Sequence, residues 1–302
     1  MDLIAAEGIE KRFGQLTALR DISLRVRRGE LYGLIGPDGA GKTTFFRILT
    51  TLIPPDGGRA TVDGLDIATD YRRIRAAVGY MPGRFSLYPD LTVKENLEFF
   101  ATLFGTRLED NYDLIRDIYV QIEPFRNRRA GRLSGGMKQK LALCCALIHR
   151  PRVLFLDEPT TGVDVVSRHE FWDMLSGLKR QGITMLVSTP YMDEAVRCDR
   201  IALIQSGRLL SIDTPQGIIE NYPDALFEVR AENMRQLTDE IRKLSSPKSC
   251  FAFGRSLHVS FSRDDTEAPQ RMRAALTAAG CTNLEIAPIT PSIEDCFIQQ
   301  MR

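Results

Sequence analysis

A glycine-punctuated turn is the first stretch of this sequence with a clear chemical use. Residues 30–50 read ELYGLIGPDGAGKTTFFRILT, and Gly36, Gly41, Lys42 and Thr43 fit the pattern G-x-x-x-x-G-K-[ST]. Glycines let backbone N–H groups close around phosphate oxygens, and the N-terminus of a following helix adds its dipole. A lysine here reaches β- and γ-phosphates, and the hydroxyl after it binds Mg²⁺. The residues expected to hold Mg·ATP are Gly36, Pro37, Asp38, Gly39, Ala40, Gly41, Lys42, Thr43 and Thr44.

Two adjacent carboxylates follow a second apolar run. Residues 153–164 read VLFLDEPTTGVD, and Asp157 and Glu158 come directly after four apolar residues. The C-terminal end of a parallel strand faces the ligand crevice of an open α/β sheet. Asp157 is therefore expected to serve the metal, and Glu158 to orient or deprotonate an attacking water. Taken alone, such a pair is more often a turn or a helix cap, and the phosphate loop favours the catalytic interpretation.

A third stretch predicts another anion-binding helix end. Residues 132–151 read RLSGGMKQKLALCCALIHRP, in which Ser134 is the predicted N-cap of a long amphipathic helix. With LSGGM in place of LSGGQ, the three stretches together resemble the ATP-binding cassette (ABC) ATPases in order and spacing, over residues 1 to about 220. The resemblance implies that two cassettes pair head to tail. Each would then close Ser134, Gly135 and Gly136 on the nucleotide held by its partner.

The resemblance implies two further site residues. TGVD at 161–164 resembles the D-loop of the family, which puts Asp164 at the seam between two cassettes. Phe13, in EKRFG, falls where an aromatic ring stacks on adenine. A packed hairpin residue is the alternative for Phe13.

Two departures from the family pattern concern hydrolysis. Pro190, in VSTPYMDEA at 187–195, stands where the family has a histidine that touches the γ-phosphate and helps to align the attacking water. Gly83, in GYMPG, stands where the family has a glutamine that bonds the metal and that water. One lost donor at a reacting phosphate costs roughly 10²–10³ in rate. We therefore expect good ATP binding and impaired turnover, with Arg84 as a possible substitute for Gly83.

The elements that must position these residues fall into two predicted domains. Short Val-, Ile- and Leu-rich runs alternate with amphipathic segments to about residue 221, which predicts an α/β ATPase domain over 1–221 with an inserted helical lobe at about 84–132. NYPD at 221–224 breaks this pattern. Residues 225–302 then predict a small α+β domain with the order βαββαβ and one added helix, which suggests a ferredoxin-like unit.

The C-terminal part points to partners. Its closing IEDCFIQQM resembles the exporter branch that includes daunorubicin-resistance ATPases, and this resemblance implies a separate integral membrane permease. Phe85, Tyr88 and the helix starting near Thr92 would form the docking face, although an aromatic stripe at helical spacing is more often core. RNRRAGR at 126–132 carries four arginines in seven residues, which form either a solvated loop or a partner or lipid contact.

Composition bounds the remaining possibilities. The 302 residues carry a formal net charge of +1, so no global field draws the chain to nucleic acid, and no nucleic-acid partner is expected. The longest clean apolar run, at 141–148, is far shorter than the roughly 20 residues that cross a bilayer, and the start lacks a secretory signal. Six cysteines without CxxC spacing favour reduced, buried thiols. The expected location is cytoplasmic, on the inner face of the cell membrane.

These observations favour the ATP-binding subunit of an ABC exporter, acting as an ATP hydrolase with a degenerate site. The alternatives are a soluble ABC protein that remodels ribosomes or DNA, and a regulatory ATP sensor with little turnover. The second cassette is either a copy of this chain, in a homodimer, or a different cassette, in a heterodimer.

Overall fold

The protein consists of two compact units. The computed structural model describes residues 1–84 and 86–301, so the predicted docking residue Phe85 lies outside the described residues. The first unit comprises Met1–Gln216 with Met301, and the second comprises Gly217–Gln300. The division into independent domains at 221 and 225 stays a prediction.

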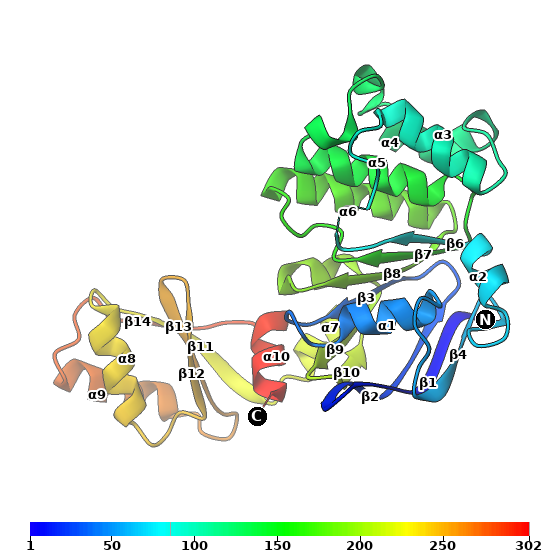
Figure 1. Ribbon diagram of the computed structural model, residues 1–302. Helices are drawn as coiled ribbons and strands as arrows, with labels where there is room; N and C mark the ends of the chain where they lie inside the picture. Colours follow the sequence, from blue (N-terminus) through cyan, green and yellow to red (C-terminus); the bar gives the residue numbers. More distant parts are fainter. Residues whose placement is uncertain (85, 302) are drawn as a thin grey trace. The chain divides into compact units, whose positions relative to one another are not determined.

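A six-stranded sheet forms the centre of the first unit (Figure 1). Its order is β10-β9-β3-β8-β7-β6, in which β10 pairs antiparallel with β9 and the other pairs are parallel. The central strands are buried on both faces, which is why they read as continuous apolar runs in the sequence. The strands are β3 (Leu31–Ile35), β6 (Val78–Met81), β7 (Val153–Asp157), β8 (Thr184–Thr189), β9 (Arg200–Gln205) and β10 (Arg208–Asp213).

A second, antiparallel sheet of order β2-β1-β4-β5 lies beyond helix α1 (Figure 1). Helix α1 (Lys42–Leu49) packs between the two sheets, since its Phe45 and Phe46 share one apolar core with Ile22 and Phe155. This packing fixes the start of α1, where the phosphate loop ends. The remaining elements here are β1 (Asp2–Phe13), β2 (Leu16–Arg27), β4 (Gly57–Val62), β5 (Leu65–Asp66) and α2 (Tyr71–Ala77).

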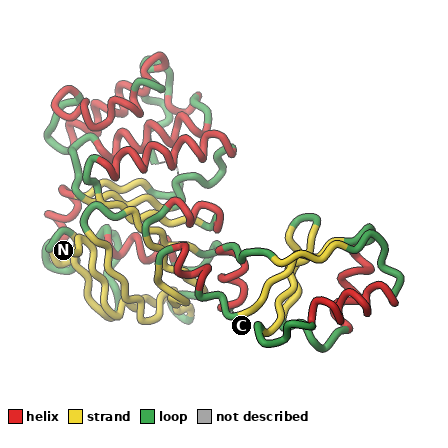
Figure 2. The backbone as a smooth tube through the Cα atoms, turned by 180° about the vertical axis from the view of Figure 1, so that it is seen from behind, coloured by secondary structure: helices red, strands yellow, loops and turns green. Residues whose placement is uncertain are grey.

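Helices cover the opposite face of the six-stranded sheet, as both views of the backbone show (Figures 1 and 2). They are α3 (Val93–Leu103), η1 (Glu109–Asn111), α4 (Tyr112–Tyr119), η2 (Glu123–Phe125), η3 (Ala130–Arg132), α5 (Gly135–Leu147) and α6 (Val165–Arg180). Helix α3 begins as predicted, because Thr92 and Glu95 form a reciprocal capping box. The predicted amphipathic character of α5 is wrong. Residues 141–147 are buried around the whole helix, since α3, α4, α6 and β6 surround it.

The second unit follows the predicted order of elements. Its sheet has the order β12-β13-β11-β14 with antiparallel pairing throughout, the order that a split βαβ unit requires, and the ferredoxin-like assignment stays a prediction. Leu257, Val259 and Phe261 share a core with Leu237 and Met272 of two helices. The elements are α7 (Pro215–Glu220), which links the units, β11 (Asp224–Arg230), α8 (Met234–Lys243), β12 (Ser249–Phe253), β13 (Ser256–Ser262), α9 (Ala268–Ala278), β14 (Glu285–Pro288) and α10 (Ile293–Gln300).

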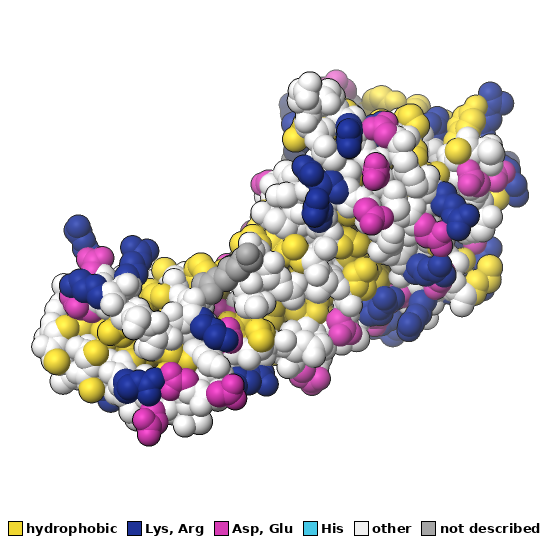
Figure 3. All heavy atoms as spheres, turned by 90° about the horizontal axis from the view of Figure 1, so that it is seen from below, with side chains coloured by type: hydrophobic (Ala, Val, Ile, Leu, Met, Phe, Trp, Pro, Cys, Tyr) yellow, Lys and Arg dark blue, Asp and Glu magenta, His cyan; other side chains and the backbone are white. Residues whose placement is uncertain are grey.

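Surface and thiol chemistry agree with the composition. Within the part of the chain that the structure describes, no helix has the length and apolar character needed to cross a bilayer. On the face drawn in Figure 3, Lys and Arg side chains are interspersed with Asp and Glu rather than gathered into one basic stripe. All six cysteines are free, and burial raises the pKa of the Cys144, Cys145 and Cys198 thiols well above the ordinary value.

Candidate functional site

Four parallel strands deliver the predicted chemistry to one edge of the sheet. Ile35 pairs with Thr189, and Asp157 pairs with Ser188, so the phosphate loop, the acidic pair and Pro190 follow neighbouring strand ends. The N–H of Gly36 donates to the carbonyl of Thr189 at 3.2 Å, which joins the loop to β8. A cavity of about 420 Å³ opens there. Its lining residues are Thr43, Arg47, Tyr80, Pro82, Gly83, Arg84, Asp157 and Glu158.

Glycine is required at two positions of the phosphate loop. Gly41 adopts φ 107°, and a Cβ added there would lie 2.6 Å from the carbonyl oxygen of Ala18. At Gly36 a Cβ would collide with the backbone of Ile204. The loop therefore packs against the strands beside it, and its glycines keep the backbone close to the position that phosphates would take.

Lys42 is the buried cation of the site. Its side chain is 2% exposed, and its Nζ donates to the carbonyl oxygens of Gly36 and Pro37 at 2.7 and 2.9 Å. The same Nζ lies 3.1 Å from a carboxylate oxygen of Glu158. A buried ammonium held by backbone carbonyls and one acid is arranged to exchange that acid for another anion. Phosphate oxygens fit this requirement.

Asp157 and Thr43 both line this cavity and carry side-chain oxygens. Asp157 is buried and accepts a hydrogen bond from Ser188 Oγ at 2.7 Å. Burial raises the pKa of the Asp157 carboxyl, while hydrogen bonds from Ser188 and Thr43 oppose that rise. A carboxylate penalised by burial gains from a bound cation, and Mg²⁺ prefers oxygen donors of this kind. The residues present therefore fit the metal that the sequence predicts.

Glu158 is held in an unusual backbone conformation. Its φ is 51°, in the left-handed region that residues other than glycine rarely adopt. Its N–H donates to the side chain and the carbonyl of Ser188 at 2.9 and 3.1 Å, which secures this conformation. Such strain costs of order 1–3 kcal/mol and is concentrated at functional sites. In this conformation the Glu158 carboxylate contacts the Lys42 ammonium.

Ser134, Gly135 and Gly136, the signature residues of the LSGGM stretch, do not line the cavity beside the phosphate loop. Ser134 caps α5 as predicted, accepting a hydrogen bond from Met137 N at 3.3 Å. A Cβ added to Gly136 would lie 2.8 Å from Ser167 Oγ, and one added to Gly135 would lie 3.7 Å from Gly162 O. These residues thus lie against the first turn of α6 and the loop before it.

Asp164 and Phe13 occupy exposed positions. Asp164 is the N-cap of α6 and accepts from Ser167 N at 3.0 Å; hydrogen bonds with Ser167 lower its pKa. Phe13 ends β1, is 49% exposed and lies 5.7 Å from the Lys11 ammonium. Phe13 pairs with Leu16 across the β1–β2 hairpin, and its contact with adenine stays a prediction.

Several residues of this region carry no local sequence signal. Ser188 bonds both members of the acidic pair, and Arg47 and Tyr80 line the cavity. Burial raises the pKa of Tyr80 to about 12. A buried Glu194 accepts from Thr160 and belongs to a larger cluster described below. The small polar residues before Pro190, in VSTP, were the only hint in the sequence that this strand end is polar.

Comparison with known proteins identifies the family. The family model described as ABC transporter matches residues 19–161. Daunorubicin resistance ATP-binding protein DrrA2 of Streptomyces coeruleorubidus is 42% identical over 98% of this chain and 94% of its own. Nod factor export ATP-binding protein I of Burkholderia lata is 36% identical over 96% and 94%. The "Probable multidrug ABC transporter ATP-binding protein YbhF" of Escherichia coli is 38% identical over 98% of this chain, which spans about half (51%) of that protein.

Solved structures agree with this assignment. A dimeric post-hydrolysis state of the cassette MJ0796 bound to ADP and Pi matches with a TM-score of 0.63 at 25% identity, over 70% of this chain and 98% of that one. A structure described as the ATP binding subunit of an ABC transporter matches with a TM-score of 0.66 at 26% identity, over 73% and 93%. Fold, motifs and relatives concur, and the chain belongs to the ATP-binding proteins of ABC transporters.

Proposed function

We propose that this protein is the nucleotide-binding subunit of an ABC exporter that binds Mg·ATP well and hydrolyses it slowly. The observation that carries the proposal is the single cavity edge at which Lys42, Thr43, Asp157 and Glu158 converge while Gly83 supplies no side chain. The names of three relatives, concerned with drug resistance, multidrug transport and Nod factor export, support the exporter role.

Binding depends on groups that are all present. The phosphate-loop amides and the Lys42 ammonium would hold the β- and γ-phosphates, and Glu158 would leave Lys42 as the γ-phosphate arrives. Thr43 and Asp157 would hold Mg²⁺, which neutralises phosphate charge when bound. Phe13 would stack on adenine, and its exposure leaves the ring free for that contact. Ser134, Gly135, Gly136 and Asp164 would face the nucleotide of a second cassette.

Hydrolysis lacks two aligning groups. Glu158, released from Lys42, would accept a proton from the attacking water. Pro190 directly follows β8 and Gly83 lies two residues after β6, and neither residue offers a donor or acceptor side chain to orient that water. Arg84 lines the same cavity and is the residue nearest in sequence to the missing glutamine. The base is retained and its alignment is weakened.

An ordered aromatic surface supports docking to a membrane permease. Tyr88 is 47% exposed and packs edge-on against exposed Phe99, with ring centroids 4.8 Å apart. Buried Asn96 fixes this loop: its side chain accepts from Tyr88 N at 3.0 Å and donates to the carbonyl oxygens of Tyr88 and Leu91 at 3.1 and 3.3 Å. An exposed aromatic pair, with Tyr88 on a hydrogen-bonded loop and Phe99 on α3, is suited to a protein partner.

The experiment that tests the proposal compares Lys42→Ala with wild type. Lys42→Ala should abolish ATP-dependent dimerisation in size-exclusion chromatography, because the site loses its only buried phosphate-facing cation among the described residues. Dimerisation of that variant at wild-type ATP affinity would contradict the site assignment. Purification from the native membrane should bring down an integral membrane protein. Nucleic acid in its place would favour the ribosome- or DNA-remodelling alternative.

A further inference from the structure

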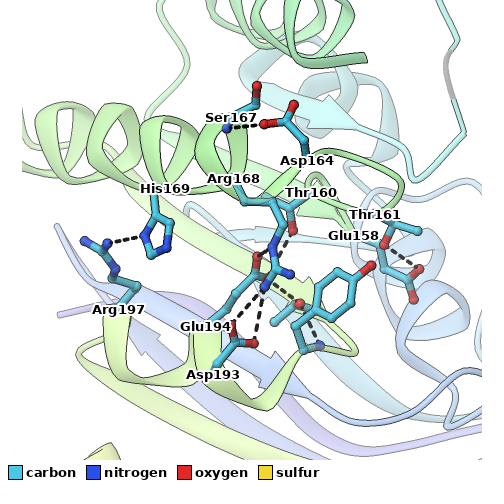
Figure 4. Close-up of polar contacts among 12 residues, drawn as sticks. Glu158, Thr160, Thr161, Asp164, Ser167, Arg168, His169, Asp193, Glu194 and Arg197 are labelled. Atoms are coloured by element: carbon cyan, nitrogen blue, oxygen red, sulfur yellow. Dashed lines mark hydrogen bonds and ion pairs between the residues drawn. The ribbon is translucent and has the colours of Figure 1, made fainter.

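A buried carboxylate bonds to side chains from three segments of the chain (Figure 4). Glu194 belongs to η4 (Met192–Arg197) and is 4% exposed. Its Oε2 accepts from Thr160 Oγ1 at 3.1 Å and from Thr189 Oγ1 at 2.5 Å, and its Oε1 accepts from Arg168 Nε at 3.0 Å. One carboxylate thus joins the loop after β7, the end of β8 and helix α6.

Glu194 binds Thr189, the residue before Pro190, and Arg168 contacts the residues after it. The segment 189–193 is called the Pro190 turn below. The Arg168 guanidinium lies 4.0 Å from the ring centroid of Tyr191, the residue after Pro190. Its Nη2 also donates to both carboxylate oxygens of Asp193 at 3.1–3.2 Å. The Tyr191 N–H in turn donates to Thr189 Oγ1 at 3.0 Å. The residues on both sides of Pro190 are therefore fixed by one planar cation and the carboxylate that it pairs with.

The same arginine reaches the seam region. Arg168 lies in the first turn of α6, one residue after Ser167, whose N–H is capped by Asp164. Thr160 stands between Glu158 and Asp164 in the loop that leads into this helix. A displacement of the loop or of α6 would move Thr160 and Arg168, and both would act on Glu194. The cluster therefore connects two regions. One is the Asp164 surface, which is expected to meet a second cassette, and the other contains Glu158 and residue 190, where hydrolysis would occur.

We infer that Arg168 and Glu194 are positioning residues for ATP hydrolysis, which hold the Pro190 turn in register with Glu158 and transmit the position of the Asp164 loop to it. This inference rests on the proposed function. Neither residue lines the cavity beside the phosphate loop, so neither is expected to bind nucleotide directly. The geometry matters because reacting groups misplaced by about 1 Å lose on the order of 10²-fold in rate.

The test uses Arg168→Lys, which keeps the charge beside Glu194 and removes the planar fork and the ring stack. Its matched control is Arg197→Lys, on the same short helix as Glu194. Arg197 makes exposed contacts to Asp173 and His169 at 3.1 and 3.0 Å and takes no part in the cluster (Figure 4). Steady-state ATP hydrolysis is measured with the purified full chain in complex with its permease. Thermal unfolding is measured on the same samples.

The expected result is a split between kcat and KM. Arg168→Lys should lower kcat by at least about tenfold, with KM for ATP unchanged within about twofold, and Arg197→Lys should match wild type in both. In a Pro190→His background the gain in kcat from histidine should be smaller when residue 168 is lysine, because the turn would then be misaligned. A purely structural ion pair would not produce this coupling.

Two results would overturn the inference. Equal kcat in folded Arg168→Lys and wild type would show that the cluster does not position the reacting groups. A parallel loss of kcat, ATP affinity and thermal stability, with no coupling to residue 190, would assign the cluster a structural role alone. If Arg168→Lys does not fold, the paired change Arg168→Met with Glu194→Gln removes both charges together and is held to the same criteria. Absence of turnover in both wild type and Pro190→His would instead refute the proposed function, and this inference with it.

Discussion

Restoring the two missing side chains, at positions 83 and 190, tests most sharply whether their absence slows ATP hydrolysis. In Gly83→Gln with Pro190→His, glutamine and histidine return to the positions at which the family carries them. Gly83 does not require a positive φ, so its backbone accepts a side chain. A Cβ there would lie 3.0 Å from Asp157 O and 3.7 Å from the Cβ of Glu158. The neighbours must give by a few tenths of an ångström, which costs about 1 kcal/mol.

The gain should exceed that cost. One preorganised donor at a reacting phosphate contributes about 3–4 kcal/mol to the transition state, and each 1.36 kcal/mol is tenfold in rate. Subtracting about 1 kcal/mol for the tight contact, and allowing for imperfect placement of histidine after a strand end fitted to proline, leaves at least about tenfold in kcat. The single changes should give less than the pair, because both groups orient one water.

The assay is phosphate release at saturating Mg·ATP, with Glu158→Gln introduced into wild type and into the restored protein as control. Glu158→Gln should stop hydrolysis in both and preserve the ATP-bound dimer. A folded double variant that releases phosphate at the wild-type rate would contradict the proposed effect of Gly83 and Pro190. Phosphate release that survives Glu158→Gln would contradict the role of Glu158, since the base would then lie elsewhere.

Three further changes test other parts of the site. Ser134→Arg should block the closed dimer and leave ATP binding by the monomer nearly intact. The monomer should lose about 1 kcal/mol of folding free energy with the α5 cap. A large loss of monomer ATP affinity in titration calorimetry would show that Ser134 serves the nucleotide of its own chain. Asp157→Asn should raise the metal-free melting temperature by about 2–4 °C. The reason is that the raised pKa of Asp157 means that its ionised form destabilises the fold at neutral pH. Calorimetry with Mg·ATP should show that the nucleotide-dependent stabilisation is lost. Burial lowers the pKa of His149, whose ring stacks on Phe104 with ring centroids 3.8 Å apart, so the fold favours the neutral imidazole. The free energy of unfolding should therefore fall as pH drops below about 6.5, by up to about 1.4 kcal/mol per pH unit. His149→Gln should reduce this pH dependence in urea unfolding over pH 5–7, and an unchanged slope would contradict the assignment.

Local chemistry explains which features the sequence predicted. The phosphate loop and the Ser134 cap depend on residues within one turn of each other, so their spacing suffices to recognise them. Thr92 with Glu95 is a capping box of the same kind, and α3 begins there. The acidic pair is predicted from a strand followed by carboxylates, because parallel strands present their carboxyl ends to the crevice. The phosphate loop elsewhere in the chain then favours the catalytic interpretation over a turn or a helix cap.

Features that depend on tertiary packing could not be predicted from the sequence. The sequence of 135–147 predicts an amphipathic helix, yet α3, α4, α6 and β6 bury residues 141–147 on every side. The pairing of Arg168 with Glu194 spans 26 residues, and neither residue belongs to a motif recognised in the chain. The left-handed conformation of Glu158 also has no signal in its residue type; it is imposed by hydrogen bonds to Ser188 on the neighbouring strand.

The proposed function separates good ATP binding from slow turnover. Both are measured on wild-type protein assembled with its permease and freed of contaminating ATPases, as the equilibrium dissociation constant for Mg·ATP and as kcat. We expect micromolar binding that Lys42→Ala abolishes, and a kcat below about 1 s⁻¹, a hundredfold or so under an unimpaired site. Tight binding accompanied by turnover of tens per second that Glu158→Gln eliminates would contradict this expectation.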